Sequence, residues 1–312
     1  MINENKNFTN FKIHTQYSIC EGAIKIDDLA NYCKENKIKS IGLCDSYNLC
    51  GALEFAEKIS KSGTQPLLGS QINFLIDGLI AKIPIFATSN IAYKNLTKLS
   101  SKSYLSSDGT TEPHCLIEDL ENLNEDLIVL SGNHQDLFGK LFKLNKLKVI
   151  ENYLLKIKNI FQDRFYIEIQ RHNEEGERDF EKYLLQLSYK HKISIIASQE
   201  VYYIKQDMYE AHDALICIGE KNFIDDPKRV KFSNQHYIKS TDELKKLYND
   251  IPEALENNYN FPFRFNFKPK KSLPILPSLK IEKNMTVKDE LLSQAKIGLK
   301  NRLENFVFNK DK

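Results

Sequence analysis

The sequence predicts an α/β fold in which a mainly parallel sheet curls into a closed or nearly closed barrel. Up to Lys221, short apolar runs alternate with longer segments of helical periodicity. Strands that alternate with helices are typical of a parallel sheet with helices on its outside. About six or seven such units follow one another, and that number favours a barrel over an open sheet.

Each element is expected from its local pattern. Strands are expected at the apolar runs FKIHT, SIGLCD, PLLGSQINF, IPIFAT, DLIVLSG, FYIEIQR and SIIASQE. Helices are expected at about 26–36, 49–60, 93–105, 136–161, 177–191 and 207–220. Asp27 and Asp28 fall in the first turn of the first helix, where carboxylates stabilise a helix start.

The C-terminal part of the chain lacks this alternation. In FPFRFNFKPK, phenylalanine occupies every second position from Phe261 to Phe267, and basic residues are interleaved. An extended strand burying one aromatic face is favoured over a stacking platform for single-stranded nucleic acid. Residues 287–306 have helical spacing, but their leucines have no obvious partner. We therefore expect a barrel domain at 1–240, a connecting segment at 241–280 and the incomplete start of another region at 281–312.

Composition restricts the class of protein. The formal net charge is +2, from 44 Lys+Arg and 42 Asp+Glu, so charge gives no argument for nucleic-acid binding. The six cysteines include no C-x-x-C pair, which favours reduced thiols over disulfides or a zinc site. The polar N-terminus lacks a signal segment, and no apolar run approaches the roughly 18 residues of a membrane helix. A soluble, cytoplasmic protein is expected.

Polar side chains occur where the apolar runs end, and they are His14, Asp45, Ser46, Gln71, Asn133, Arg171, His172 and Glu200. In a βα barrel these strand ends form the rim on which active sites are built. Strands also end in polar loops for no functional reason, and the pattern fits both explanations equally. The pattern therefore indicates a pocket at the rim but does not indicate which reaction or ligand the pocket serves.

Several segments resemble the polymerase and histidinol phosphatase (PHP) domain of bacterial replicative polymerases, namely FKIHTQYSICEGAIKIDDL, LCDSYNLCGALEFAEK, QPLLGSQINF and FYIEIQRH. Others resemble the DNA polymerase III alpha subunit in particular, namely ASQEVYYIKQDMYEAHDALICIGEK, HYIKSTDELKKLYNDIPEALENN and KPKKSLPILP. The resemblance covers about residues 8–306. It implies a distorted (β/α)7 barrel with an extended linker and a helical tail, and a truncated chain that stops at the start of the palm region.

In that family nine rim residues hold up to three divalent metal ions. Carried over one by one, those positions fall here on Lys12, His14, Glu21, Ser46, Gln71, Lys82, Asn133, Glu200 and Tyr202. Only His14 is the family residue itself, while Glu21 and Glu200 keep a carboxylate. His172 and His212 are not among the nine positions, and we interpret both as structural.

The resemblance therefore implies a vestigial rim pocket without metal or catalytic residues. A unit charge pair 4 Å apart at an effective dielectric near 20 is worth about 4 kcal/mol, so each lysine would repel a divalent ion by about 8 kcal/mol. Lys12 and Lys82 are expected instead to pair with Glu21 and Glu200. The family's Gly-rich segment and palm carboxylates, which bind Mg²⁺ in the full polymerase, do not occur in this sequence.

The function implied is that of the N-terminal part of a replicative DNA polymerase, a DNA-directed nucleotidyltransferase, with this chain inactive alone. The barrel would act in DNA replication as a scaffold and as a docking site for the proofreading exonuclease subunit. The alternative is a stand-alone, metal-dependent PHP phosphoesterase, which the replaced ligand set disfavours.

Overall fold

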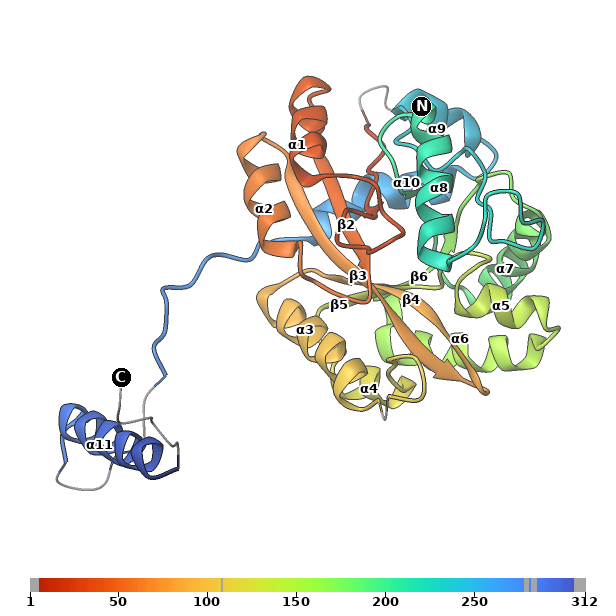
Figure 1. Ribbon diagram of the computed structural model, residues 1–312. Coiled ribbons are helices and arrows are strands. Elements are labelled where there is room, and N and C mark those ends of the chain that lie inside the picture. The colour runs from red at the N-terminus through yellow and green to blue at the C-terminus, as the bar shows by residue number, and fades with distance from the viewer. Residues whose placement is uncertain (1–5, 108, 278–280, 282–284, 306–312) are drawn as a thin grey trace. The chain divides into compact units, whose positions relative to one another are not determined.

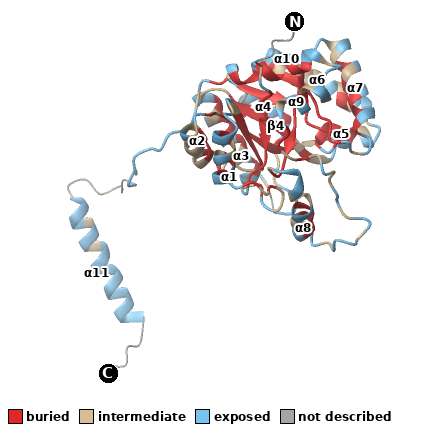
Figure 2. Cartoon of the chain, turned by 90° about the horizontal axis from the view of Figure 1, so that it is seen from above, coloured by how far each residue is buried: buried red, intermediate tan, exposed pale blue. Residues whose placement is uncertain are grey.

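The computed structural model describes residues 6–107, 109–277, 281 and 285–305. Two compact units are present, Met1–Lys270 and Lys271–Lys312. In the first unit, helices surround a strongly curved sheet (Figure 1). Buried residues gather on the strands and the inner helix faces, and exposed residues on the outer faces (Figure 2).

The sheet forms a distorted barrel. Six strands pair in the order β2–β3–β4–β5–β6–β7, with bounds Ser40–Ser46, Gln65–Ile76, Leu79–Ala87, Leu127–Leu130, Phe165–Ile169 and Ile195–Ala197. A separate parallel pair joins β1 (Lys12–Ile13), the first strand of the chain, to β8 (Glu200–Val201), which follows β7 in the chain. This pairing brings Lys12 opposite Glu200. The Gly42 amide of β2 donates to the Asn10 carbonyl at 2.9 Å, so the N-terminal strand also contacts the other edge of the sheet.

Gly42 is required for this close approach. A Cβ at this position would lie 2.2 Å from the Phe11 carbonyl oxygen, a contact that the backbone could not relieve cheaply. The expected α/β barrel is confirmed, and its closure depends on a residue without a side chain.

The sheet is mainly parallel, as expected, because β2–β3, β5–β6, β6–β7 and β1–β8 are parallel pairs, but it also contains an antiparallel hairpin. β3 and β4 form an antiparallel hairpin, and β4 pairs antiparallel with β5. The hairpin turn consists of Asp77 and Gly78, with φ of 52° and 79°. Positive φ at both positions matches the turn that suits the twist of paired strands. The apolar runs PLLGSQINF and IPIFAT could not show whether the two strands run parallel or antiparallel, because side chains alternate with the same period in both arrangements.

Helices surround the sheet. They are α1 (Ile26–Glu35), α2 (Ala52–Lys61), α3 (Asn90–Leu105), α4 (Ile117–Asn122), α5 (Leu137–Lys143), α6 (Leu147–Phe161), α7 (Glu177–His191), α8 (Tyr209–Glu220), α9 (Thr241–Leu247) and α10 (Pro252–Asn260). Among them, α8 lies against the rim loop that carries Cys20 and Glu21. The one helical region expected at 136–161 is two helices, because the chain turns at Asn145 with φ of 55°. Short 3₁₀ helices span Gln162–Arg164, Gln206–Met208 and Phe261–Arg264.

Local capping explains where two of these helices begin. The Ser89 hydroxyl accepts the Ala92 amide at 3.2 Å at the start of α3. Ser240 and Glu243 form a capping box at the start of α9, each side chain bonding the other residue's amide. Such caps satisfy amides that a helix start leaves unpaired.

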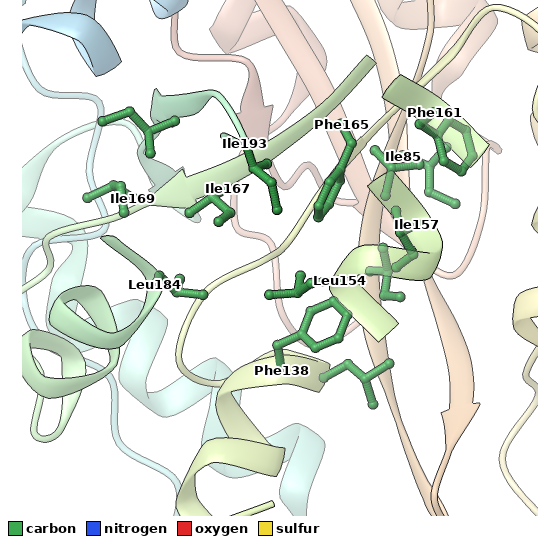
Figure 3. Close-up of a cluster of buried hydrophobic side chains, with 14 of the residues drawn as sticks. Ile85, Phe138, Leu154, Ile157, Phe161, Phe165, Ile167, Ile169, Leu184 and Ile193 are labelled. Atoms are coloured by element: carbon green, nitrogen blue, oxygen red, sulfur yellow. The ribbon is translucent and has the colours of Figure 1, made fainter. Parts of the chain in front are cut away.

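Apolar side chains fill the space between the helices and the sheet. Figure 3 shows Phe138, Leu154 and Ile157 from α5 and α6 packed against Phe165 and Ile167 of β6. Each of the five side chains is at most 1% exposed to solvent. Burial of each such side chain is worth about 1.5–3 kcal/mol, so this cluster fixes the helices on the strands.

The amino end of the barrel is closed by aromatic rings. The Phe261 ring lies 4.5 Å from Phe11 and 5.5 Å from Phe86, and Phe265 joins the same cluster. Phe263 is 85% exposed. The expected strand with four phenylalanines on one face is therefore wrong: a 3₁₀ turn directs two rings inward and one outward.

The barrel unit is also larger than the 1–240 domain expected. Tyr248, Leu255 and Tyr259, from the end of α9 and from α10, belong to the main hydrophobic core. The Asn258 amide donates to the carbonyl oxygens of Thr9 and Ala197 at 3.0 and 2.9 Å. Residues 241–270 are thus part of the barrel unit, because their apolar side chains contact elements distant in sequence.

The second unit contains α11 (Val287–Asn305), the helix expected at 287–306, of which Phe306 lies outside the described residues. No described residue of α11 is buried, and Leu291, Leu299 and Leu303 are 69%, 59% and 61% exposed. An isolated helix of this length is marginal in water, because most helical stability comes from tertiary packing.

We expect α11 to be less stable than the barrel. In hydrogen exchange on the monomeric chain, the amides of Glu290–Leu303 should exchange at least about a hundredfold faster than those of β3 and β4, because local opening costs far less than global unfolding. The β3 and β4 amides serve as the internal control. Equal protection of both groups would contradict the expectation.

Candidate functional site

The rim residues named from the sequence lie together at the carboxyl ends of the strands. A cavity of about 320 Å³ opens there, and its lining includes six of the nine positions, Glu21, Gln71, Lys82, Asn133, Glu200 and Tyr202. The other three contact these residues directly. Lys12 and His14 reach Glu200, and Ser46 donates to Glu21. The nine positions thus form one contiguous group.

Lys12 is the centre of the group. Its side chain on β1 is fully buried, and its Nζ lies 3.1 Å from Asp136, 3.4 Å from Glu168 and 3.5 Å from Glu200. Burial acts to lower the pKa of this lysine, but the three carboxylates outweigh burial and hold the pKa well above its ordinary value. An ammonium therefore lies where these carboxylate oxygens converge.

Glu200 accepts hydrogen bonds from several directions. His14 Nε2 lies 2.9 Å and Gln71 Nε2 2.7 Å from its Oε1, and the Asn133 amide donates to its Oε2. Burial acts to raise the pKa of Glu200, but Lys12 and His14 outweigh it and hold the pKa well below the ordinary value. Gln71 and Asn133 donate protons at positions where the family's ligands would present lone pairs.

A second ion pair forms the mouth of the cavity. Lys82 Nζ contacts both oxygens of Glu21 at 2.7 and 2.8 Å and the Ser46 hydroxyl at 3.0 Å. It also lies 5.0 Å from the centre of the Tyr47 ring. Burial acts to raise the pKa of Glu21, yet Lys82 outweighs it and lowers that pKa. Glu21 is thus held ionised by a lysine.

These donors do not fit a cluster of divalent metal ions. The Lys12 ammonium lies 3.5 Å from Glu200 and the Lys82 ammonium 2.7 Å from Glu21, and each would repel a divalent ion by an energy on the order of 8 kcal/mol at 4 Å. Within the described residues, no group of three or more His, Cys, Asp and Glu side chains is arranged to hold a metal. The carboxylates are already paired with fixed cations.

Sequence reasoning missed three acidic members of the site. Asp136 and Glu168, which contact Lys12, are outside the nine positions, and Glu174 lies between two histidines of the cavity wall. Glu168 offered one signal, because it is a carboxylate inside the otherwise apolar strand FYIEI. Asp136 and Glu174 are in loops and offered none.

Glu174 joins segments that are distant in the chain. Its two oxygens lie 3.0 Å from His134 Nε2 and 2.9 Å from His236 Nε2. Burial acts to raise the pKa of Glu174, but the hydrogen bonds from both histidines outweigh it and lower the pKa well below the ordinary value. The loop at 221–239 is thereby fixed to the cavity wall.

Two histidines interpreted as structural from the sequence, His172 and His212, both form hydrogen bonds with backbone atoms. His172 Nε2 accepts the Glu200 amide at 3.2 Å, and its ring stacks on His236 with centroids 4.1 Å apart. Burial and His236 lower the pKa of His172 to about 4. His212 donates to the Glu21 carbonyl at 2.8 Å, and burial lowers its pKa to about 4. Both rings position the residues that carry the two ion pairs.

Two other polar residues from the sequence pattern do not line the cavity. Asp45 accepts hydrogen bonds from the Thr15 amide and hydroxyl and from the Ser18 hydroxyl at 2.6, 2.7 and 2.7 Å. Arg171 donates hydrogen bonds to Glu181 through Nε and Nη2, along one edge of its guanidinium group, and to Asp250 through Nη1 and Nη2, along another edge. They fix loops behind the rim.

Comparisons with known proteins agree with this architecture. Residues 10–172 match the family model of the PHP domain. The chain is 34% identical over 314 residues to the DNA polymerase III subunit alpha of Caulobacter vibrioides, covering 98% of this chain and 28% of that protein. It is 33% identical over 298 residues to the subunit of the same name from Rickettsia bellii, covering 95% and 25%.

The chain therefore spans about a quarter of the length of these curated relatives. Among solved structures, it is similar to an amidohydrolase from Chromobacterium violaceum with bound sulfate and no metal, at 10% identity and a TM-score of 0.42. That similarity covers 67% of this chain and 96% of the other. Among the described helices, none is long and apolar enough to cross a membrane.

Replacing Lys12 should destabilise the fold. Lys12→Met leaves three buried carboxylates without their cation, and loss of one partner of a buried pair costs about 3–5 kcal/mol of unfolding free energy. Lys182→Met, which removes an exposed lysine of α7, should change it by less than about 0.5 kcal/mol. Urea unfolding at pH 7 measures both, and equal stability of Lys12→Met and the unchanged chain would contradict the assignment.

The same ion pairs predict acid lability. The folded-state pKa values of Glu200 and Glu21 lie below their unfolded values, so the unfolded chain binds protons first as the pH falls. Their stabilisation is complete above about pH 5 and is lost below it. The stability difference between the unchanged chain and Lys12→Met should therefore shrink from pH 7 to pH 3 in urea unfolding. A constant difference would contradict the pairing.

Proposed function

This chain belongs to the PHP domain family, and on that basis we propose that it is the N-terminal region of a bacterial DNA polymerase III alpha subunit, acting there as a scaffold in DNA replication. The two relatives match over 98% and 95% of this chain, including residues beyond the PHP match. In the cytoplasm, it would act together with the other regions of that polymerase.

The observation that carries the scaffold role is the position of the Lys12 ammonium. It contacts three carboxylates, Asp136, Glu168 and Glu200, which come from separate loops and strands of the rim. The lysine ammonium holds these carboxylates in place with a single positive charge. Unlike a metal ion, it has no coordination site at which a water molecule could be exchanged. Unlike a bound divalent metal, it cannot lower the pKa of a water molecule to produce a nucleophile at neutral pH.

The alternative of a stand-alone, metal-dependent phosphoesterase finds no such support. That chemistry needs carboxylates and imidazoles with free lone pairs facing a metal. Here, His14 and Gln71 contact Glu200, and Lys82 occupies both oxygens of Glu21. In the whole polymerase, nucleotide addition would use Mg²⁺ bound by palm carboxylates, and we assign none of that chemistry to the rim residues.

We also propose that the barrel docks the proofreading exonuclease subunit. Four exposed apolar side chains, Ile19, Ile218, Phe223 and Ile224, belong to the segments that supply Glu21 and Glu220 to the cavity lining, and we call them the apolar rim patch. Gly219 of α8 packs against Cys20, so the two segments that carry the patch are adjacent. Clustered exposed apolar residues are typical of protein contact sites.

The purified chain should contain no stoichiometric divalent metal and show no metal-dependent phosphoesterase activity. The expected result is the same background rate for the unchanged chain and His14→Ala, with or without added Mn²⁺ or Zn²⁺. Elemental analysis and release of nucleotides from a labelled oligonucleotide measure these outcomes. Two or three ions per chain, or Mn²⁺-dependent release that His14→Ala abolishes, would support the phosphoesterase instead.

Binding of the exonuclease subunit should depend on the apolar rim patch. Ile218→Ser/Phe223→Ser should weaken the affinity at least about tenfold, since truncating buried interface anchors typically costs more than about 1.4 kcal/mol. Tyr189→Ser, at a 91% exposed position on α7, is the control and should change nothing. Titration calorimetry gives both affinities. The docking surface would be excluded if the unchanged chain did not bind the exonuclease subunit, or if Ile218→Ser/Phe223→Ser bound it as tightly as Tyr189→Ser does.

A further inference from the structure

A second hollow lies on the outside of the barrel, away from the rim residues. It is a groove of about 920 Å³ between α3 and the segment 266–270, and we call it the lysine groove. Helix α3 lies on the outer surface of the sheet (Figure 1). No residue of this groove lines the rim cavity, so the proposed scaffold role does not account for it.

All the charged side chains that line the groove are positive. Its lining contains four lysines, Lys94, Lys98, Lys268 and Lys270, and no carboxylate. Within the part of the chain that the structure describes, none of the four takes part in an ion pair, whereas Lys58, Lys102 and Lys156 do. Unpaired ammonium groups along one surface attract a polyanion, even though the chain as a whole has a net charge of only +2.

Helical geometry places two of these charges in a row. Lys94 and Lys98 are four residues apart on α3, so they lie on the same face and about 6 Å apart along the axis. Lys268 and Lys270 alternate in the neighbouring non-helical segment and line the opposite wall. One extended anionic strand can therefore contact both walls.

Two aromatic rings form part of the groove. The rings of Tyr93 and Phe267 are 5.3 Å apart with 38° between their planes, and both side chains are half-buried. Phe267 differs from its neighbours, because Phe261 and Phe265 are buried in the barrel and Phe263 is exposed. A ring that is partly packed and partly open offers a fixed face on which a base can stack.

We propose that the lysine groove binds single-stranded nucleic acid. Ammonium groups on two walls match the phosphate backbone, and the paired rings match planar bases. An acidic polypeptide would match the charges but would leave the rings without a specific partner. The inference goes beyond the scaffold role and depends only on the groove.

The experiment compares two 5′-labelled 20-mers by fluorescence anisotropy, oligo(dT) and an abasic strand of equal charge, at about 50 and about 200 mM salt. The unchanged chain should bind oligo(dT) more tightly than the abasic strand. Lys94→Glu/Lys98→Glu should weaken oligo(dT) binding at least about tenfold and reduce the slope of log affinity against log salt by about 1.4, from about 0.7 for each lost phosphate contact.

Matched variants separate specific binding from general charge effects. Lys148→Glu/Lys205→Glu changes the net charge equally at exposed positions outside the groove and should leave affinity unchanged. Phe267→Leu keeps an apolar side chain but removes the ring. It should weaken oligo(dT) binding by about 5- to 150-fold, the equivalent of about 1–3 kcal/mol of base stacking, and leave the abasic strand unaffected. Thermal unfolding checks that each variant is folded.

Three results would overturn the proposal. The first is no saturable oligo(dT) binding at the lower salt concentration. The second is an equal loss of affinity in Lys94→Glu/Lys98→Glu and in the control pair. The third is equal affinity for oligo(dT), the abasic strand and a poly-Glu peptide of the same charge, with no effect of Phe267→Leu, which would indicate an acidic polypeptide as the occupant.

Discussion

The carboxyl end of the barrel depends on the buried positive charge of Lys12. Its three partners, Asp136, Glu168 and Glu200, come from a loop after β5, from β6 and from β8, while Lys12 itself is on β1. Carboxylates this deeply buried are tolerated only when a cation compensates them. The ammonium therefore fixes the strands on both sides of the barrel's closure.

The two ends of the barrel are closed by different physical means. At the amino end, Phe11, Phe86 and Phe261 exclude water by aromatic packing, and the chain must continue through α9 and α10 to supply Phe261. At the carboxyl end, charged groups converge, and Glu200 is held ionised by Lys12 and by hydrogen bonds. A barrel fixed at both ends supports the scaffold role that we propose, because its interior would stay unchanged if a partner bound to its outer surface.

On the outer surface, the local charge of one groove differs from the net charge of the whole chain. The net charge of +2 gives no indication of a polyanion site, yet the lysine groove combines Lys94 and Lys98 with Lys268 and Lys270 and contains no carboxylate. Elsewhere many lysines are paired, as Lys82 is with Glu21. The total charge is a sum over the whole surface, whereas binding depends on which charges remain unpaired within a few ångströms of one another.

The sequence by itself determined the α/β class and the approximate bounds of α1, α2 and α7, because these follow from local periodicity. The nine rim positions came from the resemblance of short motifs to the PHP family. Only the tertiary structure decided the antiparallel β3–β4 pair, the extension of the barrel unit to Lys270 and the complete partner set of Lys12. Asp136 and Glu168 are 124 and 156 residues away from that lysine. Periodicity reports which face of an element is buried, but not which distant side chain meets it there.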